Sequence, residues 1–480
     1  MKSEALSRAG SFFSEHAWVN GGWVKNVVLT VAADGTWQNI ELNAPEQAPA
    51  GANRLSGPVL PGIVNAHSHA FQRAIVGLTE RRSRTSDASD DFWSWRDRMY
   101  SAANRITPEQ LEAIASQLYA ELLVGGYTQV CEFQYLHNNM GGAPYADPAE
   151  MALALVRAAR KTGIGLTLLP TLYMRSGFKA SGLHPLRKDQ LRFASTPDSV
   201  MRVVDAVQRQ TLNDARINCG VAMHSLRAAS PAALVELASA AKSAGLPVHI
   251  HIAEQTQEVT DCIFETGQRP IEWLMSHLSV DASWNLVHAT HATPAELQAV
   301  QDSGAAIVIC PATEANLGDG VFDLPAYAAA GGNWSIGSDS HVTRSWPEEL
   351  RLLEYSQRLT LRQRNIAARV LGHESSAAAL FEAALQGGAA ACGQPSGGLQ
   401  VGQRADFVTL DMDSPALLGV PADHVLDALV FSSPVTVFAD VFVAGERVGG
   451  GRLLGEDAAD KAGLSEITAG FRLAMRALWG

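Results

Sequence analysis

Residues 60–72 read LPGIVNAHSHAFQ, and this stretch decides the fold because it joins a short apolar run to two histidines. His67 and His69 are two residues apart, so on an extended chain both side chains point to the same face. Two imidazoles on one face can chelate one metal ion. In a barrel of parallel strands, reactive groups gather at the carboxyl ends of the strands. The stretch therefore predicts a barrel strand that ends in a metal-binding site.

Seven further apolar runs follow, with helical patterns between them. All eight runs together cover residues 63–66, 128–133, 165–172, 220–223, 247–252, 285–289, 305–309 and 334–337. Helical patterns cover residues 108–124, 148–162, 231–244, 271–277 and 294–302. Eight strands that alternate with helices are typical of a (β/α)8 barrel. The competing fold, a doubly wound open sheet, is disfavoured because no GxGxxG motif follows an early strand.

Short β-type segments also occur at both ends of the chain. Residues 26–32 and 36–41 precede the barrel, and residues 405–410 and 439–448 follow it. We therefore predict an α/β protein: a (β/α)8 TIM-like barrel with a small β-sandwich domain formed from both chain ends. The predicted boundaries are 1–60 with 393–455 for the discontinuous small domain, 61–392 for the metal-dependent barrel and 456–480 for a C-terminal helical segment.

Composition excludes several classes of protein. Of the 480 residues, 47% are hydrophobic and 18% charged, no apolar stretch is long enough to span a membrane, and the first residues lack a signal-peptide core. The net charge is −12 without basic clusters, so nucleic acid is not an expected partner. The five cysteines are scattered and never form a CxxC pair, which favours a reducing cytoplasm. Any metal must then be bound by histidines and carboxylates.

Polar residues follow three later strands as they follow the first. The segments are VHIHIAEQ with His249, His251 and Glu254, LVHATH with His288 and His291, and IGSDSH with Asp339 and His341. Taken alone, each residue has an ordinary interpretation: His249 suits the core, His291 and His341 suit supports or caps, and Asp339 suits a helix N-cap. Because one barrel brings its strand ends together, the coincidence of four such positions predicts a metal site.

Together, LPGIVNAHSH, VHIHIAE, LVHATH and IGSDS resemble the amidohydrolase superfamily, specifically its mononuclear deaminase branch. Binuclear members carry a carboxylated lysine at a middle strand end, and residues 163–178 and 216–227 contain no lysine. We therefore expect one divalent ion, Zn²⁺ first and Fe²⁺ as the alternative. The resemblance implies metal ligation by His67, His69, His251 and Asp339, and catalytic roles for Glu254, His288 and Asp339.

Such a site has the chemistry for hydrolytic deamination. Three imidazoles and a carboxylate leave a position for water, and a Zn²⁺-type ion lowers the pKa of that water to about 7. His288 is placed to accept or orient a proton of the water, and Glu254, three residues after His251, to protonate the departing nitrogen. The expectation is an enzyme that acts on a C=N bond and releases ammonia.

Donor groups for an acidic substrate lie in neighbouring segments of the predicted barrel. They are Gln72, Arg96, Tyr135, His224 and Arg227. Guanidinium groups bind carboxylates bidentately, so two arginines suit a small dicarboxylate. For each arginine taken alone, a surface ion pair is the commoner fate.

The segments HSHAFQRA, FWSWRDRMY, PATEANLGDG and HSLRA resemble the formimidoylglutamate deiminases of histidine degradation. This resemblance implies that N-formimidoyl-L-glutamate is converted to N-formyl-L-glutamate and ammonia, and that the five donor residues contact it. The family also leads us to expect a homodimer, whereas the cytoplasmic location and the absence of nucleic-acid and membrane partners are expected from composition. Two alternatives stay open: a deaminase of another substrate, such as a guanine-like or triazine ring, and a catalytically inactive barrel that serves as an oligomeric scaffold.

Overall fold

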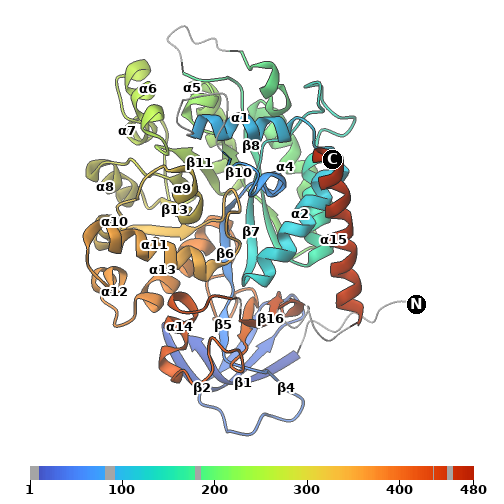
Figure 1. Cartoon of the computed structure of the whole chain (residues 1–480), viewed down its shortest axis with the longest axis vertical. Helices are drawn as coiled ribbons and strands as arrows, with labels where there is room; N and C mark the ends of the chain where they lie inside the picture. The colour runs from blue at the N-terminus through green and yellow to red at the C-terminus, as the bar shows by residue number, and fades with distance from the viewer. Residues whose placement is uncertain (1–9, 82–91, 179–184, 436, 451–457) are drawn as a thin grey trace.

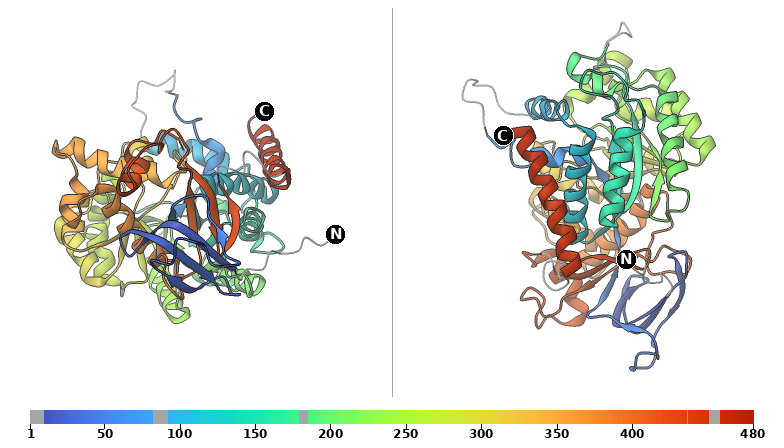
Figure 2. Two further views of the ribbon diagram at one scale, coloured as in Figure 1. Left: turned by 90° about the horizontal axis from the view of Figure 1, so that it is seen from below. Right: turned by 90° about the vertical axis from the view of Figure 1, so that its right-hand side faces the viewer.

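The computed structural model describes residues 10–81, 92–178, 185–435, 437–450 and 458–480. A sheet of parallel strands forms the centre of the molecule, with helices around it, and a second sheet lies at one end (Figure 1). The C-terminal helix runs along the side of the barrel (Figure 2). Among the described residues, none forms a helix of the length and apolarity that crossing a membrane requires.

The central sheet has the order β14-β13-β12-β11-β10-β8-β7-β6, and every neighbouring pair in it is parallel. A short extra strand, β9, pairs with β8. The strands are β6 (Ile63–Ser68), β7 (Tyr127–Gln134), β8 (Gly165–Leu172), β9 (Ile217–Cys219), β10 (Val221–Met223), β11 (Val248–Ile252), β12 (Trp284–His288), β13 (Ala306–Ile309) and β14 (Asn333–Ile336).

The chain after β14 closes the barrel against β6. Asn65 makes two hydrogen bonds to Ser338: its Oδ1 accepts the backbone N–H at 2.9 Å, and its Nδ2 donates to Oγ at 2.7 Å. Ser68 and Asp339 form a parallel bridge. Gly337 permits this close approach, because a Cβ there would lie 2.6 Å from the Cβ of His67. Closure therefore brings the end of the first strand next to the residues that follow the last one.

Helices and short 3₁₀ turns, labelled η, fill the connections. Local sequence sets their ends: Thr107 and Thr293 cap α2 and α8 through capping boxes, and each is followed by proline. The elements are η1 (Ala70–Ile75), α1 (Phe92–Ala103), α2 (Pro108–Val124), α3 (Glu150–Thr162), η2 (Lys188–Phe193), α4 (Pro197–Thr211), η3 (Leu226–Ala228), α5 (Pro231–Ala244), α6 (Thr256–Thr266), α7 (Pro270–His277), α8 (Pro294–Ser303), α9 (Pro311–Leu317), α10 (Leu324–Ala329), α11 (Trp346–Leu361), α12 (Ile366–Leu371), α13 (Ser376–Cys392), η4 (Ala422–His424), α14 (Val425–Phe431) and α15 (Ala458–Trp479).

The second sheet combines both ends of the chain in the order β17-β16-β15-β5-β1-β2-β3, with β4 paired to β1. Its core includes Phe12, Trp37, Phe407 and Phe442, and the last two rings stack with centroids 4.2 Å apart. The strands are β1 (Gly10–Val19), β2 (Gly22–Val31), β3 (Trp37–Glu41), β4 (Asn53–Arg54), β5 (Val59–Pro61), β15 (Phe407–Leu410), β16 (Phe438–Val443) and β17 (Glu446–Gly449).

The predicted fold class is confirmed: the structure has the parallel barrel and a separate sheet drawn from both chain ends. The predicted strand over 165–172 and the helices over 108–124 and 231–244 have the observed bounds. Sequence analysis missed β1 and α1, and it started the second strand of the small sheet four residues late. The division of the chain into domains at the boundaries given above stays a prediction.

The buried side chain of Arg404 joins the small sheet to the barrel. Arg404 is 3% exposed, and its Nε donates to both carboxylate oxygens of Asp406 at 2.9 and 3.0 Å. Its Nη2 also donates to Gln129 Oε1 on β7 at 2.8 Å. Gly62 is the residue between β5 and β6, and its N–H donates to the backbone carbonyl of Asp406. Arg404 thus bonds to both units at the point where the chain passes between them.

We expect Arg404→Met to lower the free energy of unfolding by about 3–5 kcal/mol, because it leaves the Asp406 carboxylate buried without its cation. Denaturant titration of the purified protein measures this. As a matched control, Arg202→Met removes an ion pair with Asp198 whose side chains are 60% and 71% exposed. The control should lose about 1 kcal/mol or less. Equal losses in the two variants would contradict the assigned role of Arg404.

Candidate metal centre

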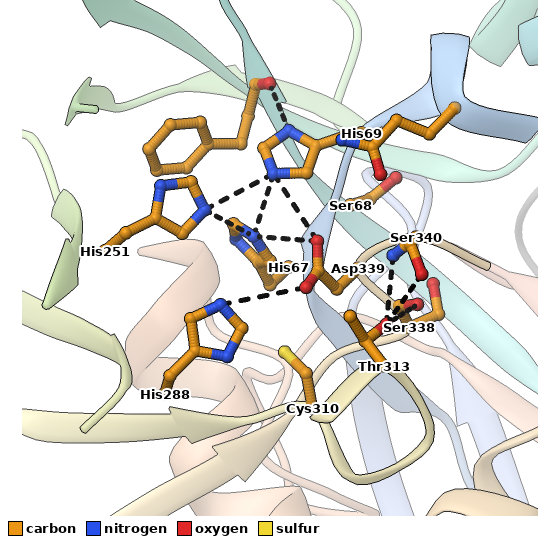
Figure 3. Close-up of polar contacts among 12 residues, drawn as sticks. His67, Ser68, His69, His251, His288, Cys310, Thr313, Ser338, Asp339 and Ser340 are labelled. Carbon is orange, nitrogen blue, oxygen red and sulfur yellow. Dashed lines mark hydrogen bonds and ion pairs between the residues drawn. The ribbon is translucent and has the colours of Figure 1, made fainter. Parts of the chain in front are cut away.

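The four predicted ligands meet at the carboxyl ends of the barrel strands. His67 and His69 come from the end of β6, His251 from β11, and Asp339 from the segment after β14. Figure 3 shows the three imidazoles pointing toward one another beside the Asp339 carboxylate. The Nε2 atoms of the three histidines lie 3.0–3.3 Å apart, and Asp339 Oδ1 lies 3.5 Å from Nε2 of both His67 and His69.

The protonation of these imidazoles suits a cation. The Nδ1–H of His69 donates to the Phe133 carbonyl at 3.0 Å, and that of His251 donates to the His224 carbonyl at 2.8 Å. A carbonyl can only accept, so the proton of each neutral ring is on Nδ1 and Nε2 carries a lone pair. Burial lowers the pKa of His67, His69 and His251, which keeps them neutral. Converging lone pairs repel one another unless a cation lies between them.

The spacing of the cluster also fits a metal. Bonds of about 2.0–2.1 Å in a tetrahedral site put neighbouring ligand atoms about 3.4 Å apart. The separations of 3.0–3.3 Å among the three histidines, and of 3.5 Å from Asp339 to His67 and His69, are close to that value. His67, His69 and His251 also form one group of donor atoms within 4.8 Å of one another. The donor set therefore fits a zinc-type ion.

His288 lies next to this cluster among three carboxylates. Its Nε2 is 3.7 Å from Glu254 Oε1 and 3.7 Å from Asp339 Oδ2, and its Nδ1 is 3.2 Å from Glu314 Oε1. Burial lowers the pKa of His288, but the carboxylates outweigh burial and raise it to about 10. Burial raises the pKa of Glu254 to about 7, so this carboxyl can carry a proton near neutral pH. The pair can therefore hold and move protons beside the cluster.

The five predicted substrate contacts all line one pocket above the cluster. Glu254, His288 and Asp339 line the same pocket, whereas His67 does not. None of the described residues that line it is a lysine. The predicted contacts are Gln72 after β6, Arg96 on α1, Tyr135 after β7, and His224 and Arg227 after β10.

The pocket wall combines donors with aromatic and apolar groups. Gln72 Nε2 is 3.4 Å from the Tyr135 hydroxyl, and the Arg96 guanidinium lies over the Tyr100 ring, 5.5 Å from its centroid. Phe92, Trp95, Met99 and Leu317 supply apolar surface. Apart from Arg96, the groups that α1 contributes to this pocket are neutral. Arg96 and Arg227 therefore suit an anionic ligand with a short carbon chain.

The other three histidines that follow predicted strands take supporting positions. His249 Nε2 donates to the Ala391 carbonyl at 2.9 Å, and His291 Nε2 to the Asp319 carbonyl at 2.9 Å. His341 Nδ1 is 2.9 Å from Ser338 Oγ, in the segment that closes the barrel. None of the three lines the pocket. Their ordinary structural interpretations agree with these contacts.

Sequence analysis missed two buried carboxylates beneath the cluster. Glu132 on β7 accepts hydrogen bonds from Ser68 Oγ and the Ala70 N–H, both at 2.6 Å, and so holds the chain on either side of His69. Glu314 on α9 accepts from the Cys310 N–H at 2.9 Å and faces His288 Nδ1. The available signal for Glu132 was that it is an acidic residue inside the apolar run 128–133. The PATEANLGDG segment contains the second.

Comparison with known proteins agrees with this geometry. Residues 59–448 match the model of the amidohydrolase family. The chain belongs to the amidohydrolase family. Formimidoylglutamate deiminase from Pseudomonas aeruginosa is 46% identical over 457 residues, which cover 94% of this chain and 97% of the relative.

Two further relatives lie at greater distance. A crystal structure described as an amidohydrolase from Brucella melitensis superposes with a TM-score of 0.89 at 40% identity, covering 98% of this chain and 100% of the other. The 5-methylthioadenosine/S-adenosylhomocysteine deaminase of Halobacterium salinarum is 28% identical, and the match covers 80% of each chain. The family assignment therefore holds over nearly the whole length of this amidohydrolase.

The contact between Glu314 and His288 leads to a prediction. We expect Glu314→Ala to lower kcat about 10- to 100-fold without loss of metal, because the partner that orients His288 is removed. Glu314→Gln should retain more activity, since its amide oxygen can still accept both hydrogen bonds. Turnover and metal analysis of the same preparations measure the two effects. Glu236→Ala, at an exposed position on α5, is the control. Wild-type turnover in Glu314→Ala would contradict the orienting role.

Proposed function

We propose that this amidohydrolase is a formimidoylglutamate deiminase, which converts N-formimidoyl-L-glutamate and water to N-formyl-L-glutamate and ammonia in histidine degradation. The observation that carries the proposal is one pocket in which a His/Asp cluster of metal-ligand type faces two arginines. The 46% identity to the deiminase of Pseudomonas aeruginosa supports the same substrate. A cytoplasmic location and a homodimeric state belong to this proposal.

His67, His69, His251 and Asp339 would hold one divalent ion, Zn²⁺ first and Fe²⁺ as the alternative. Such an ion supplies electrostatic activation of water at neutral pH. His288, which the neighbouring carboxylates hold as the imidazolium, orients the attacking water, and Asp339, 3.7 Å from His288 Nε2, accepts the proton that the water loses. Glu254 donates a proton to the departing nitrogen, so the amidine carbon exchanges NH₃ for the oxygen of water.

The substrate is held at its two acid groups. Arg96 and Arg227 bind the carboxylates, and Gln72, Tyr135 and His224 orient the chain that joins the carboxylates to the amidine. The buried setting of the pocket strengthens these charged hydrogen bonds. Binding at both ends places the amidine carbon over the cluster.

Ammonia release tests this function against its alternatives. Metal-loaded protein should release ammonia from N-formimidoyl-L-glutamate and not from guanine or an amino-triazine. Faster release from either ring compound would favour a ring deaminase. No release from any of them would favour the inactive scaffold.

Removal of the metal gives a second test. We expect one equivalent of divalent ion per chain, loss of turnover on treatment with a strong chelator, and recovery on addition of Zn²⁺, because the four proposed ligands would hold a single ion. Elemental analysis and turnover measure this. Two equivalents in the active enzyme, or full activity in metal-free protein, would contradict the single-ion site.

Substitution of the two arginines gives a third test. We expect Arg96→Met and Arg227→Met each to reduce kcat/KM roughly 10- to 150-fold, because a charged hydrogen bond contributes about 1.5–3 kcal/mol. Arg→Lys at either position should give a kcat/KM between those of wild type and of the methionine variant, since an ammonium lacks the planar fork.

The control is a formimidoyl amino acid with only one carboxylate. On that substrate one arginine should lose its importance while the other keeps it, and metal content should stay constant throughout. If both methionine variants act on the dicarboxylate like wild type, the arginines do not form the substrate pocket.

A further inference from the structure

Arg227 is carried by η3, a single turn of three residues after β10. Ser225, which precedes the turn, makes no side-chain capping hydrogen bond. One 3₁₀ turn has few internal hydrogen bonds of its own. The position of the Arg227 guanidinium therefore depends on contacts from outside η3.

Two consecutive residues after β8 bond all three backbone carbonyls of this turn. The guanidinium of Arg175 donates from Nη2 to the Leu226 carbonyl at 2.8 Å and from Nε to the Arg227 carbonyl at 3.0 Å. The backbone N–H groups of Met174 and Arg175 donate to the Ala228 carbonyl at 2.7 and 3.0 Å. The segment after β8 thus acts as a template on which η3 is fixed.

The other end of Arg227 faces a buried carboxylate. Glu258 Oε2 lies 3.8 Å from Arg227 Nη1, and the two side chains are 1% and 12% exposed. The same oxygen accepts the backbone N–H of Glu254 at 3.1 Å. Arg227 is therefore fixed at its backbone by Arg175, while its guanidinium faces the pocket next to the segment that carries Glu254.

We propose that Arg175 is a positioning residue for substrate specificity: it fixes η3 so that Arg227 presents its guanidinium fork to one carboxylate of the substrate. This inference rests on the proposed function, because it assumes that Arg227 binds a carboxylate. Arg175 does not line the pocket and acts only through Arg227. Its planar guanidinium reaches two carbonyls at once, which a single ammonium group does not do with the same geometry.

The test is a pair of substitutions at Arg175 in the zinc-loaded full-length protein. Arg175→Met should raise KM for N-formimidoyl-L-glutamate about tenfold while kcat stays within about threefold, because carboxylate binding is weakened and the reacting groups are untouched. Arg175→Lys should rescue part of the loss. Arg202→Met, which removes an exposed arginine on α4, should leave KM unchanged. A lower Tm for Arg175→Met with unchanged KM would overturn the proposal, because it would make Arg175 a structural brace alone.

A double-mutant cycle separates this inference from the proposed function. In an Arg227→Met background, Arg175→Met should change KM by less than about twofold, since its effect passes through Arg227. Additive effects of the two substitutions would overturn the inference. If Arg227→Met alone leaves KM unchanged, the assigned substrate pocket is wrong. If Arg227→Met raises KM but Arg175→Met does not, only the positioning role of Arg175 is wrong.

Discussion

Three imidazole nitrogens that face one another across 3.0–3.3 Å are the constraint on which the rest of the structure depends. Their lone pairs repel, so the protein must hold them in place and provide for a cation between them. Backbone carbonyls of Phe133 and His224 fix two of the rings. The bonds between Asn65 and Ser338 bring Asp339 beside the same point. The contacts that close the barrel therefore also place Asp339 beside the cluster.

Charge is layered around this cluster. Buried carboxylates lie beside and beneath it: Glu254 and Glu314 face His288, and Glu132 holds the chain around His69. Cationic side chains, Arg96 and Arg227, line the pocket above. Carboxylates around the histidines control protons, and arginines in the pocket wall favour an anionic substrate. Because the arginines and the carboxylates lie in different parts of the site, the pocket can bind an anionic substrate while the carboxylates that move protons stay next to the cluster.

The sequence was most informative where a local pattern has one geometric consequence. Strand alternation puts His67 and His69 on one face, and the eight apolar runs define the barrel on which His251 and Asp339 also lie. Glu132 was missed because its partners, Ser68 and Ala70, lie more than 60 residues away in the sequence. Strand β1 was missed because GSFFSEHAWV alternates irregularly. Arg96 and Arg227 were predicted from their chemistry, and the family resemblance supported them, whereas the role of Arg175 depends on contacts between loops that no local pattern reveals.

The amidine carbon of N-formimidoyl-L-glutamate has two C–N bonds, and the proposed chemistry requires that the terminal one breaks. Turnover in ¹⁸O-labelled water, followed by mass spectrometry of the products, tests this most directly. With Glu254 delivering a proton to the terminal nitrogen, the products should be ammonia and N-formyl-L-glutamate that carries the label in its formyl group. Formation of formamide and glutamate would contradict the proposed orientation of the substrate between the arginines and the cluster.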